Sequence, residues 1–458
     1  MRPVAAVRQL TATLLLAGIC TDVFGAGFAI QEQSASSLGN AFAGGAAIAQ
    51  DATTTFFNPA GLTRLPANQL VAGVHFIRPQ LKFSNNGTVN LLGQPVVSGS
   101  SGGDAGSTIP VPDFYYAHRL DGHTVVAIAV NAPFGLKTEY DAGWVGRYQA
   151  IKSELRTVNI NPSIGYQVDH HLSIGAGIDA QYIKADLTQA VDYGGACVAQ
   201  LIQAGQSPGA AGATCASFGL VPQHSDGTAS ISGNDWSYGF NVGLLYELDA
   251  ATRFGVAYRS KVGHTVTGSA SFTNAPAIFT AKGVFVPTAV HAGITLPDIL
   301  SVSAYHDLDS RWALMGDVTW THWSRFQQLR VDYASSQSPS ITDENWKNTL
   351  RYSLGANYRY NSRWLLRGGI AYDQTPIPDA QHRTPRIPGN NRTWLALGFR
   401  YQASPALALD AGYAHLFISS TAIDHQDIHA GQPGGGGTVV GSYDSSVDIV
   451  SAQATWSF

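Results

Sequence analysis

The sequence is short of charge. Asp, Glu, Lys and Arg make up 13% of its 458 residues, whereas an average soluble domain carries about 25%. The formal net charge is -4, while nucleic-acid-binding domains are usually strongly basic. At 45% hydrophobic residues, the chain is too apolar to be intrinsically disordered. This composition excludes a nucleic-acid partner and leaves a protein with a large buried core or a wall that faces lipid.

Long apolar runs are also missing. Residues 1–25 hold a basic start, Arg2 and Arg8, and an apolar stretch, 10–19, that is too short to cross a membrane. This arrangement predicts a secretory signal peptide over 1–25, removed from the mature chain. Beyond it no stretch reaches the roughly 18 uninterrupted apolar residues of a spanning helix. The exported chain is therefore either soluble or a transmembrane β-barrel.

Cysteine and catalytic motifs are scarce. Beyond the signal peptide only Cys197 and Cys215 are present, and in an oxidising compartment they could form one disulfide or remain free thiols. The sequence has no H-E-x-x-H, no C-x-x-C and no P-loop. The adjacent His170 and His171 fall in a predicted turn, where solvated side chains are expected rather than metal ligands. We therefore expect no enzyme, no cofactor and no metal site.

What the chain does have is strict alternation of apolar and polar residues. From Leu172 to Tyr182 the even positions are apolar and the odd positions are small or polar, which is typical of a β-strand. Aromatic residues end several apolar faces, among them Trp312, Trp364 and Trp456. Such ends are where the interfacial aromatic girdles of a membrane barrel lie.

Alternation of this kind occurs in fourteen regions. They are 68–83, 112–119, 123–131, 150–168, 171–187, 229–247, 251–268, 289–306, 311–330, 347–360, 363–373, 391–402, 405–416 and 446–458. Short and long links alternate between them, as in barrels with short turns at one end and long loops at the other. The sequence thus predicts an all-β fold, a transmembrane antiparallel barrel of about fourteen strands over 68–458, with both termini at the short-turn, periplasmic end.

Residues 26–67 precede the first predicted strand. They are small and semi-polar but include Phe28, Phe42, Phe56 and Phe57, whose rings favour burial. A fourteen-strand barrel has a lumen too wide for its wall side chains to fill. We therefore expect this segment to plug the lumen; the alternative is a flexible periplasmic tail.

Several stretches resemble the FadL family of outer-membrane long-chain fatty acid transporters, which includes importers of aromatic hydrocarbons. The similar stretches are 27–28, 37–41, 52–62, 133–136, 144–148, 159–163, 366–376 and 383–388. They follow the family order along the whole mature chain. The resemblance implies a bacterial outer-membrane barrel in which an N-terminal hatch carries the signature Asn58-Pro59-Ala60.

The resemblance also implies candidate site residues. Phe28 is the expected ligand contact at the N-terminus, and Lys184 and Arg330 are candidate partners for a ligand carboxylate. Alternation places both cations on the outward face, so ordinary charges of the barrel rim are the alternative. Asn131, Pro133 and Gly135 are the expected kink of a lateral opening, because Pro cannot donate to a strand ladder and Gly permits a bend; the start of an outer loop is the alternative.

The expected function is uptake of long-chain fatty acids or similar hydrophobic compounds. Outer loops would capture the ligand, the barrel would bind it, and movement of the N-terminal hatch would release it sideways. The alternatives are import of monoaromatic hydrocarbons on the same scaffold, or a general diffusion porin. Expected partners are the hydrophobic ligand, outer-membrane lipid and, during biogenesis, the barrel assembly machinery, and we expect a monomer.

Overall fold

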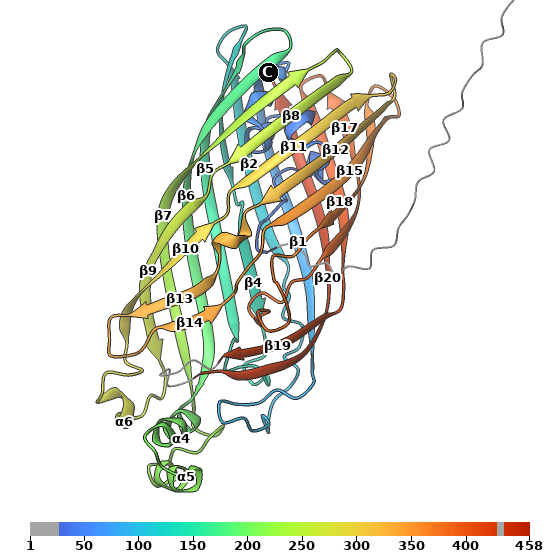
Figure 1. Cartoon of the computed structure of the whole chain (residues 1–458). Coiled ribbons are helices and arrows are strands. Elements are labelled where there is room, and N and C mark those ends of the chain that lie inside the picture. Colours follow the sequence, from blue (N-terminus) through green and yellow to red (C-terminus); the bar gives the residue numbers. More distant parts are fainter. Residues whose placement is uncertain (1–26, 428–434) are drawn as a thin grey trace, which may run out of the picture.

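The computed structural model of the chain describes residues 27–427 and 435–458 (Figure 1). The predicted signal peptide lies outside the described residues. Among the described residues, no helix is both long and apolar enough to span a membrane. The helical elements are α1 (Ala35–Leu38), α2 (Gly45–Ile48), α3 (Thr54–Phe57), η1 (Pro59–Arg64), α4 (Tyr193–Gln203), α5 (Pro208–Ser217), α6 (Ala277–Thr280) and η2 (Trp323–Arg325).

The wall is a closed antiparallel barrel of fourteen strands, sealed by the pairing of the first and last segments from Gln69 to Asn85. The segments are β1 (Gln69–Asn85), β2 (Ile109–Arg119), β3 (Thr124–Asn131), β4 (Gly135–Glu139), β5 (Lys152–Gln167), β6 (Leu172–Asp192), β7 (Asp226–Glu247), β8 (Thr252–Arg259), β9 (Val262–Phe272), β10 (Thr288–Leu296), β11 (Ile299–Asp307), β12 (Trp312–Thr321), β13 (Gln328–Tyr333), β14 (Ser340–Asp343), β15 (Thr349–Arg359), β16 (Trp364–Asp373), β17 (Arg392–Ser404), β18 (Leu407–Ile418), β19 (Thr421–Asp427) and β20 (Gly437–Ser457).

These segments confirm the predicted fold. All fourteen predicted regions are strands, and the predicted aromatic end residues Trp312, Trp364 and Trp456 are exposed on the outer face. Several regions predicted as one strand consist of two segments, with breaks between β8 and β9, β10 and β11, and β12 and β13. One break falls at Pro297, which cannot donate a ladder hydrogen bond. The alternation of residue types does not reveal such breaks, because it continues on both sides of them.

The short links are tight turns with a shared side-chain cap. The Oδ1 atom of Asp121 accepts hydrogen bonds from the backbone amides two and three residues later, at 2.8 and 2.7 Å. The same pair of bonds recurs at Asp169, Asp249, Asp309 and Asn361. An Asx turn of this kind fixes the reversal locally, so these links were readable from the sequence.

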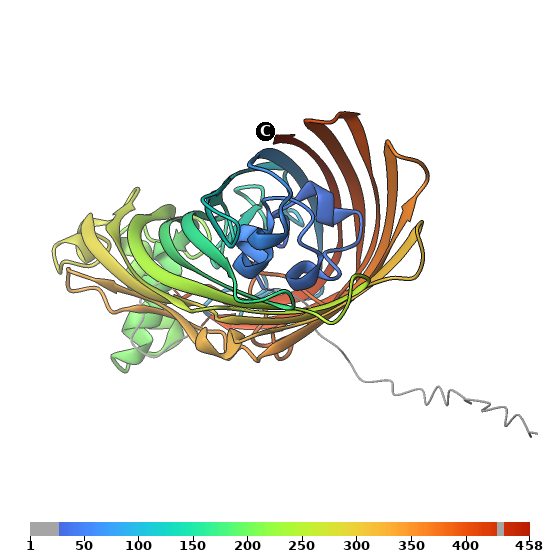
Figure 2. The same cartoon turned by 90° about the horizontal axis from the view of Figure 1, so that it is seen from above.

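The predicted plug lies inside the barrel. Figure 2, a view along the barrel, shows the N-terminal segment within the ring of strands. Arginine side chains of the wall donate hydrogen bonds to backbone carbonyl oxygens of the plug. The bonds run from Arg351 to Ala41, from Arg253 to Ala47 and Ile48, from Arg259 to Phe56, and from Arg119 to Thr63 and Leu65, at 2.7–2.9 Å. Hydrogen bonds from charged donors are stronger than neutral ones, so residues 41–65 are firmly held.

Glycines of the inward wall face let the plug approach closely. A Cβ atom at Gly175 would overlap the backbone of Pro59 and Ala60, and one at Gly369 would overlap the backbone of Asn40. Charged residues of the inward wall face are buried, and Arg400 binds both Asp410 and the plug residue Asp51 at 2.9 Å. Small residues and paired charges together form the seat of the plug.

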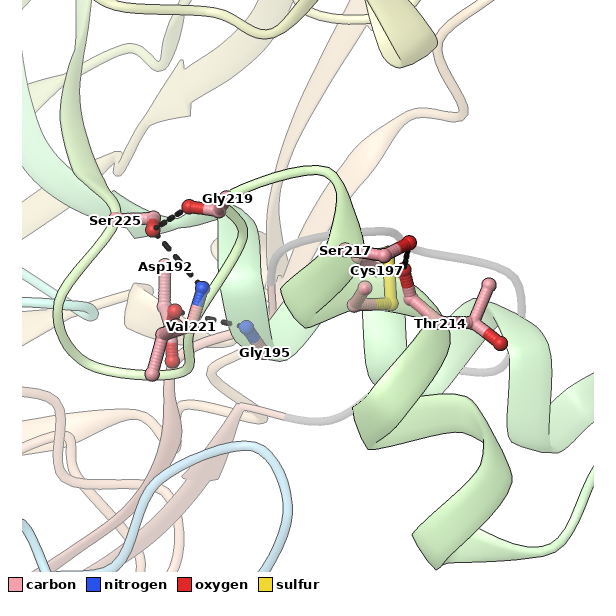
Figure 3. The surroundings of a disulfide bond; sticks show 9 residues. Asp192, Gly195, Cys197, Thr214, Ser217, Gly219, Val221 and Ser225 are labelled. Atoms are coloured by element: carbon pink, nitrogen blue, oxygen red, sulfur yellow. Dashed lines mark hydrogen bonds between the residues drawn. A yellow bond between two sulfur atoms is a disulfide. The ribbon is translucent and has the colours of Figure 1, made fainter.

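The long loops gather at the other end of the barrel (Figure 1). In the loop between β6 and β7, a disulfide joins Cys197 of α4 to Cys215 of α5 (Figure 3). The sequence left open whether these two cysteines form a disulfide or remain free thiols, and the structure shows the disulfide. The side chain of Asp192 caps α4 by accepting from the amide of Gly195 at 2.8 Å. The bonded helix pair therefore projects from the barrel as one unit.

Replacing Gly175 by Val is expected to unseat the plug, because the added side chain would occupy the space of Pro59 and Ala60. The expected result in planar bilayers is a larger steady conductance than that of the unaltered barrel. Gly293→Val is the matched control, because a Cβ at that position meets nothing within 4 Å. Equal conductance of both variants would contradict the proposed seat.

Candidate functional site

Phe28 is the centre of a buried aromatic cluster. Its ring centroid lies 4.9 Å from that of Trp323, 5.6 Å from Trp346, 5.8 Å from Phe326 and 6.1 Å from Phe134. Edge-to-face and tilted contacts at these distances are favourable. The cluster joins the first described residues of the chain to three links of the wall: the link between β12 and β13, the link between β14 and β15, and the link between β3 and β4. Phe28 thus lies where several separate parts of the wall meet.

The third strand is interrupted at residues 132–134, and the N-terminal segment fills the interruption. The amide of Ile30 donates to the carbonyl oxygen of Pro133 at 2.9 Å, and the amide of Gly135 donates to that of Phe28 at 2.9 Å. The side-chain amide of Gln33 donates to Ala132 at 2.9 Å. Backbone groups left unpaired by the interruption therefore find partners in residues 28–33.

Thr157 of β5 holds the other side of the same interruption. Its hydroxyl group donates to the carbonyl oxygen of Phe134 at 2.6 Å and accepts from the amide of Phe134 at 3.0 Å. β3 pairs with both β2 and β5, whereas β4 pairs with β5. The interruption is thus clasped by the N-terminal segment from within and by Thr157 from one neighbouring strand.

Two cavities meet at Phe28. One, of about 90 Å³, is almost wholly apolar and is lined by Leu155, Ile183, Val266, Ile294, Leu329 and Val331. The other, of about 600 Å³, is lined from within by Phe28 and Ile30 and from outside by Pro110, Val130 and Val158, which are exposed on the outer face. The larger cavity therefore passes through the wall at the interrupted strand. Small-molecule sites commonly measure about 300–1,000 Å³.

One guanidinium lines the apolar cavity. Arg386 donates to the hydroxyl oxygen of Ser153 at 2.9 Å and to the side-chain carbonyl oxygen of Gln189 at 2.5 Å. Both partners are neutral, so the positive charge of Arg386 is not matched by these bonds. An anionic group of a ligand in this cavity would meet a charge-assisted donor.

A carboxyl group also lines the apolar cavity. Glu344 is buried and accepts from the indole nitrogen of Trp346 at 2.9 Å. Burial raises the pKa of the Glu344 carboxyl to about 8, because desolvation disfavours the ionised form. The group is therefore largely neutral near pH 7 and does not compete with an anionic ligand for Arg386.

The structure places the predicted site residues in three different settings. Phe28 lines both cavities. The strand interruption at 132–134 contains Pro133 and lies between Asn131, which ends β3, and Gly135, which begins β4. Lys184 and Arg330 instead lie partly exposed on the outer face and line neither cavity. Each is paired with an acidic residue two positions later, Lys184 with Asp186 at 3.3 Å and Arg330 with Asp332 at 2.7 Å. Alternation, not the expected ligand role, gives their position.

The signature Asn58-Pro59-Ala60 is hydrogen-bonded both to the rest of the plug and to the barrel wall. The side-chain amide of Asn58 donates to Ala46 within the plug and to Leu244 of the wall at 2.6 and 3.0 Å. Its oxygen accepts from the amide of Ala60 at 3.0 Å, which starts η1. These residues contact the wall rather than either Phe28 cavity.

Sequence reasoning did not find Arg386, Glu344, Trp323 or Trp346. Arg386, Glu344 and Trp346 lie in irregular segments between strands and Trp323 begins the short helix η2, where the two-residue periodicity of a strand carries no information. The stretch 383–388 was noted for its resemblance, but nothing in it singled out Arg386. These residues lie 295 to 358 positions after Phe28 in the sequence, so their proximity to it is a tertiary property.

Thr157→Val is expected to loosen the interrupted strand, because the amide of Phe134 loses its hydroxyl acceptor. One neutral hydrogen bond contributes about 1 kcal/mol, so amide hydrogen exchange over 132–135 should quicken by roughly fivefold. Thr455→Val, at a buried threonine of β20, is the control and should leave this exchange unchanged. Unchanged exchange in both variants would show that Thr157 does not hold the strand.

Comparison with known proteins gives a consistent picture. Residues 16–458 match the family model described as "Outer membrane protein transport protein (OMPP1/FadL/TodX)". The chain is 30% identical to the long-chain fatty acid transport protein of Escherichia coli K12, over 89% of this chain and 91% of that one. It is 31% identical to outer membrane protein P1 of Haemophilus influenzae, over 89% and 88% of the two chains.

Solved structures share the fold. A Pseudomonas aeruginosa FadL homologue superposes with a TM-score of 0.83 at 23% identity, covering 94% of this chain and all of that one. The toluene transporter TodX of Pseudomonas putida superposes with a TM-score of 0.68 at 18% identity, over 95% and 99% of the two chains. The chain therefore belongs to the FadL family and is a transporter of hydrophobic compounds in the bacterial outer membrane.

Proposed function

We propose that the transported compound is a long-chain fatty acid. The observation that carries this proposal is Arg386 at a mostly apolar cavity, which Glu154 and Glu344 also line, with neutral hydrogen-bond partners of Arg386 in Ser153 and Gln189. Burial of an acyl chain contributes about 0.8 kcal/mol per methylene, and a guanidinium is suited to a carboxylate. A ligand with an apolar chain and one anionic end fits both features.

Import of monoaromatic hydrocarbons is the second candidate. It is favoured by the rings around Phe28, which suit an aromatic guest, but it leaves Arg386 without a role. A general diffusion porin fits less well, because the plug occupies the lumen (Figure 2). Transport requires no bond-making residue, and no enzymatic activity is proposed.

For the route, we propose that only the first described residues move. Residues 28–33 meet the interrupted strand through three hydrogen bonds between neutral groups. Residues 41–65 are instead bound by five wall arginines: four donate to backbone carbonyl oxygens of the plug, and the fifth, Arg400, pairs with the carboxylate of Asp51. Withdrawal of Phe28 would join the two cavities and, at the same time, break the hydrogen bonds that residues 28–33 make with the interrupted strand. The ligand would then leave sideways, past Asn131, Pro133 and Gly135, while Asn58-Pro59-Ala60 remains in place as the stationary hatch.

This route gives the domains distinct tasks. Residues 26–67 act as hatch and gate, and 68–458 supply the wall, the binding cavity and the loops that first capture the ligand. Outer-membrane lipid receives the ligand. A monomeric barrel inserted by the barrel assembly machinery remains the expectation.

Arg386→Gln tests the substrate. Loss of a charge-assisted bond should weaken binding of a long-chain fatty acid by roughly tenfold or more, with no change for toluene, which carries no charge. Isothermal titration of the detergent-solubilised barrel measures both. Arg330→Gln, on the outer face and paired with Asp332, is the matched control. Saturable toluene binding combined with unaltered fatty acid binding in Arg386→Gln would support the aromatic candidate instead.

The raised pKa of Glu344 predicts a pH dependence. As pH rises above about 8, the carboxyl ionises and places a negative charge beside Arg386 and the bound carboxylate. Fatty acid affinity should therefore fall by roughly tenfold between about pH 7 and about pH 9, and Glu344→Gln should abolish that fall. A fall of the same size in both proteins would show that another group titrates.

A further inference from the structure

Seven charged residues form a cluster at outward register positions of the wall, at the long-loop ends of β4, β5 and β6; six are at least partly exposed and Glu154 is buried among them. This rim cluster consists of Lys137, Glu139, Lys152, Glu154, Arg156, Lys184 and Asp186. With four cations and three anions, it carries one excess positive charge. The outward face of these strands is otherwise apolar toward the short-turn end, so the charges are concentrated in this one place and not spread over the surface.

The strand register brings two cations directly opposite each other. Arg156 of β5 pairs with Lys184 of β6, and the next outward pair toward the loops is Glu154 with Asp186. Like charges directly opposite on one face destabilise a sheet. Here a pair of cations is followed by a pair of anions. The repulsion within each pair is therefore offset by ion pairs along the strands, between Arg156 and Glu154 and between Lys184 and Asp186.

The acidic residues do not satisfy the cations fully. The carboxylate of Glu154 is shared between Lys152, at 2.9 Å, and Arg156. The side chain of Arg156 is 69% exposed and that of Lys184 is 45% exposed. Arg156 has five N–H donors, and one shared carboxylate accepts at most a few of them. The remaining donors face outward beside the ammonium group of Lys184.

The cluster lies at the depth of lipid headgroups. From Arg156 toward the short-turn end, the outward residues of β5 are Val158, Ile160, Pro162, Ile164 and Tyr166. Ten residues of strand rise about 33 Å, or about 25 Å along the membrane normal at a tilt of about 40°, which matches the apolar band of outer-membrane barrels. With Tyr166 at the inner interface, Arg156 therefore lies at the outer one.

The cluster also borders the passage through the wall. Arg156 lies directly opposite Gly135, where the interrupted strand resumes. Lys137, Glu154 and Arg156 line the cavity of about 600 Å³ that crosses the wall, together with the exposed Val158. An anion held by Arg156 would therefore sit at the rim of the passage, with apolar wall immediately beneath it.

We propose that Arg156 and Lys184 bind the phosphate group of an outer-leaflet lipid at the rim of the passage. A guanidinium and an ammonium side by side provide several charge-assisted donors to phosphate oxygens. The acyl chains of that lipid would lie against Val158 and the apolar residues below it. A phosphate between the two cations also relieves their mutual repulsion. The site depends on the outer-membrane location of the barrel and not on the identity of the transported compound.

The test compares retention of two lipids by the purified full-length barrel. Native mass spectrometry measures bound lipid after detergent exchange, with phosphorylated lipid A and dephosphorylated lipid A as the probes. We expect the unaltered protein to retain the phosphorylated form selectively. The double variant Arg156→Gln/Lys184→Gln should retain it roughly tenfold less, since each cation contributes to attraction of an anionic headgroup.

Two controls isolate the phosphate contact. Arg330→Gln removes another exposed, ion-paired cation of the outer face and should retain lipid as the unaltered protein does. Arg156→Lys/Lys184→Arg keeps both charges and should retain most binding. If the Gln double variant fails to fold, salt dependence of the unaltered protein serves instead, because headgroup attraction is screened by salt. Equal retention of both lipids, salt-insensitive retention, or full retention by a folded Gln double variant would each overturn the proposal.

Discussion

The structure depends on one constraint: backbone N–H and C=O groups in a lipid environment need partners within the protein. Closure of β1 on β20 supplies them around the whole ring. At residues 132–134 the third strand gives up part of its ladder, and its backbone groups are instead paired by Ile30, Phe28 and Thr157. The interruption of the strand and the N-terminal segment that fills it are therefore a single hydrogen-bonded unit.

The same constraint separates the two faces of every strand. Charges excluded from the lipid side are directed into the lumen, where they bind the plug. Arg253, Arg259 and Arg351 donate to plug carbonyl oxygens, and Arg400 binds Asp51. The polar lumen is thus not a water channel lined by charge but the socket of a folded segment. Residues 28–33 instead meet the interrupted strand through hydrogen bonds between neutral groups, and these are the residues whose movement we propose.

Alternation explains why the side chain of Lys184 lies on the outward face and lines neither Phe28 cavity. Its outward position follows from the even register of β6, and the paired strand places Arg156 beside it. The cation at the apolar cavity comes from an irregular segment instead, where no such rule applies. Arg386 reaches that cavity because the link between β16 and β17 folds back over Ser153 of β5.

The amino-acid sequence alone was sufficient for the fold class, the number of strands and the alternating short and long connections, because each follows from local period and turn residues. It also predicted the plug, because the phenylalanine rings of residues 26–67 favour burial and a fourteen-strand lumen is too wide for wall side chains to fill. The strand break between Asn131 and Gly135 falls where the sequence placed a kink, while the roles expected of Phe28 and of this break stay predictions. Tertiary structure alone decided the disulfide between Cys197 and Cys215, the strand breaks near Ser260 and Pro297, and the meeting of Phe28 with Trp323, Trp346 and the cavity of Arg386. The physical reason is that alternation specifies which face of the wall a side chain occupies, whereas contacts between irregular segments depend on how the closed barrel brings distant parts of the chain together.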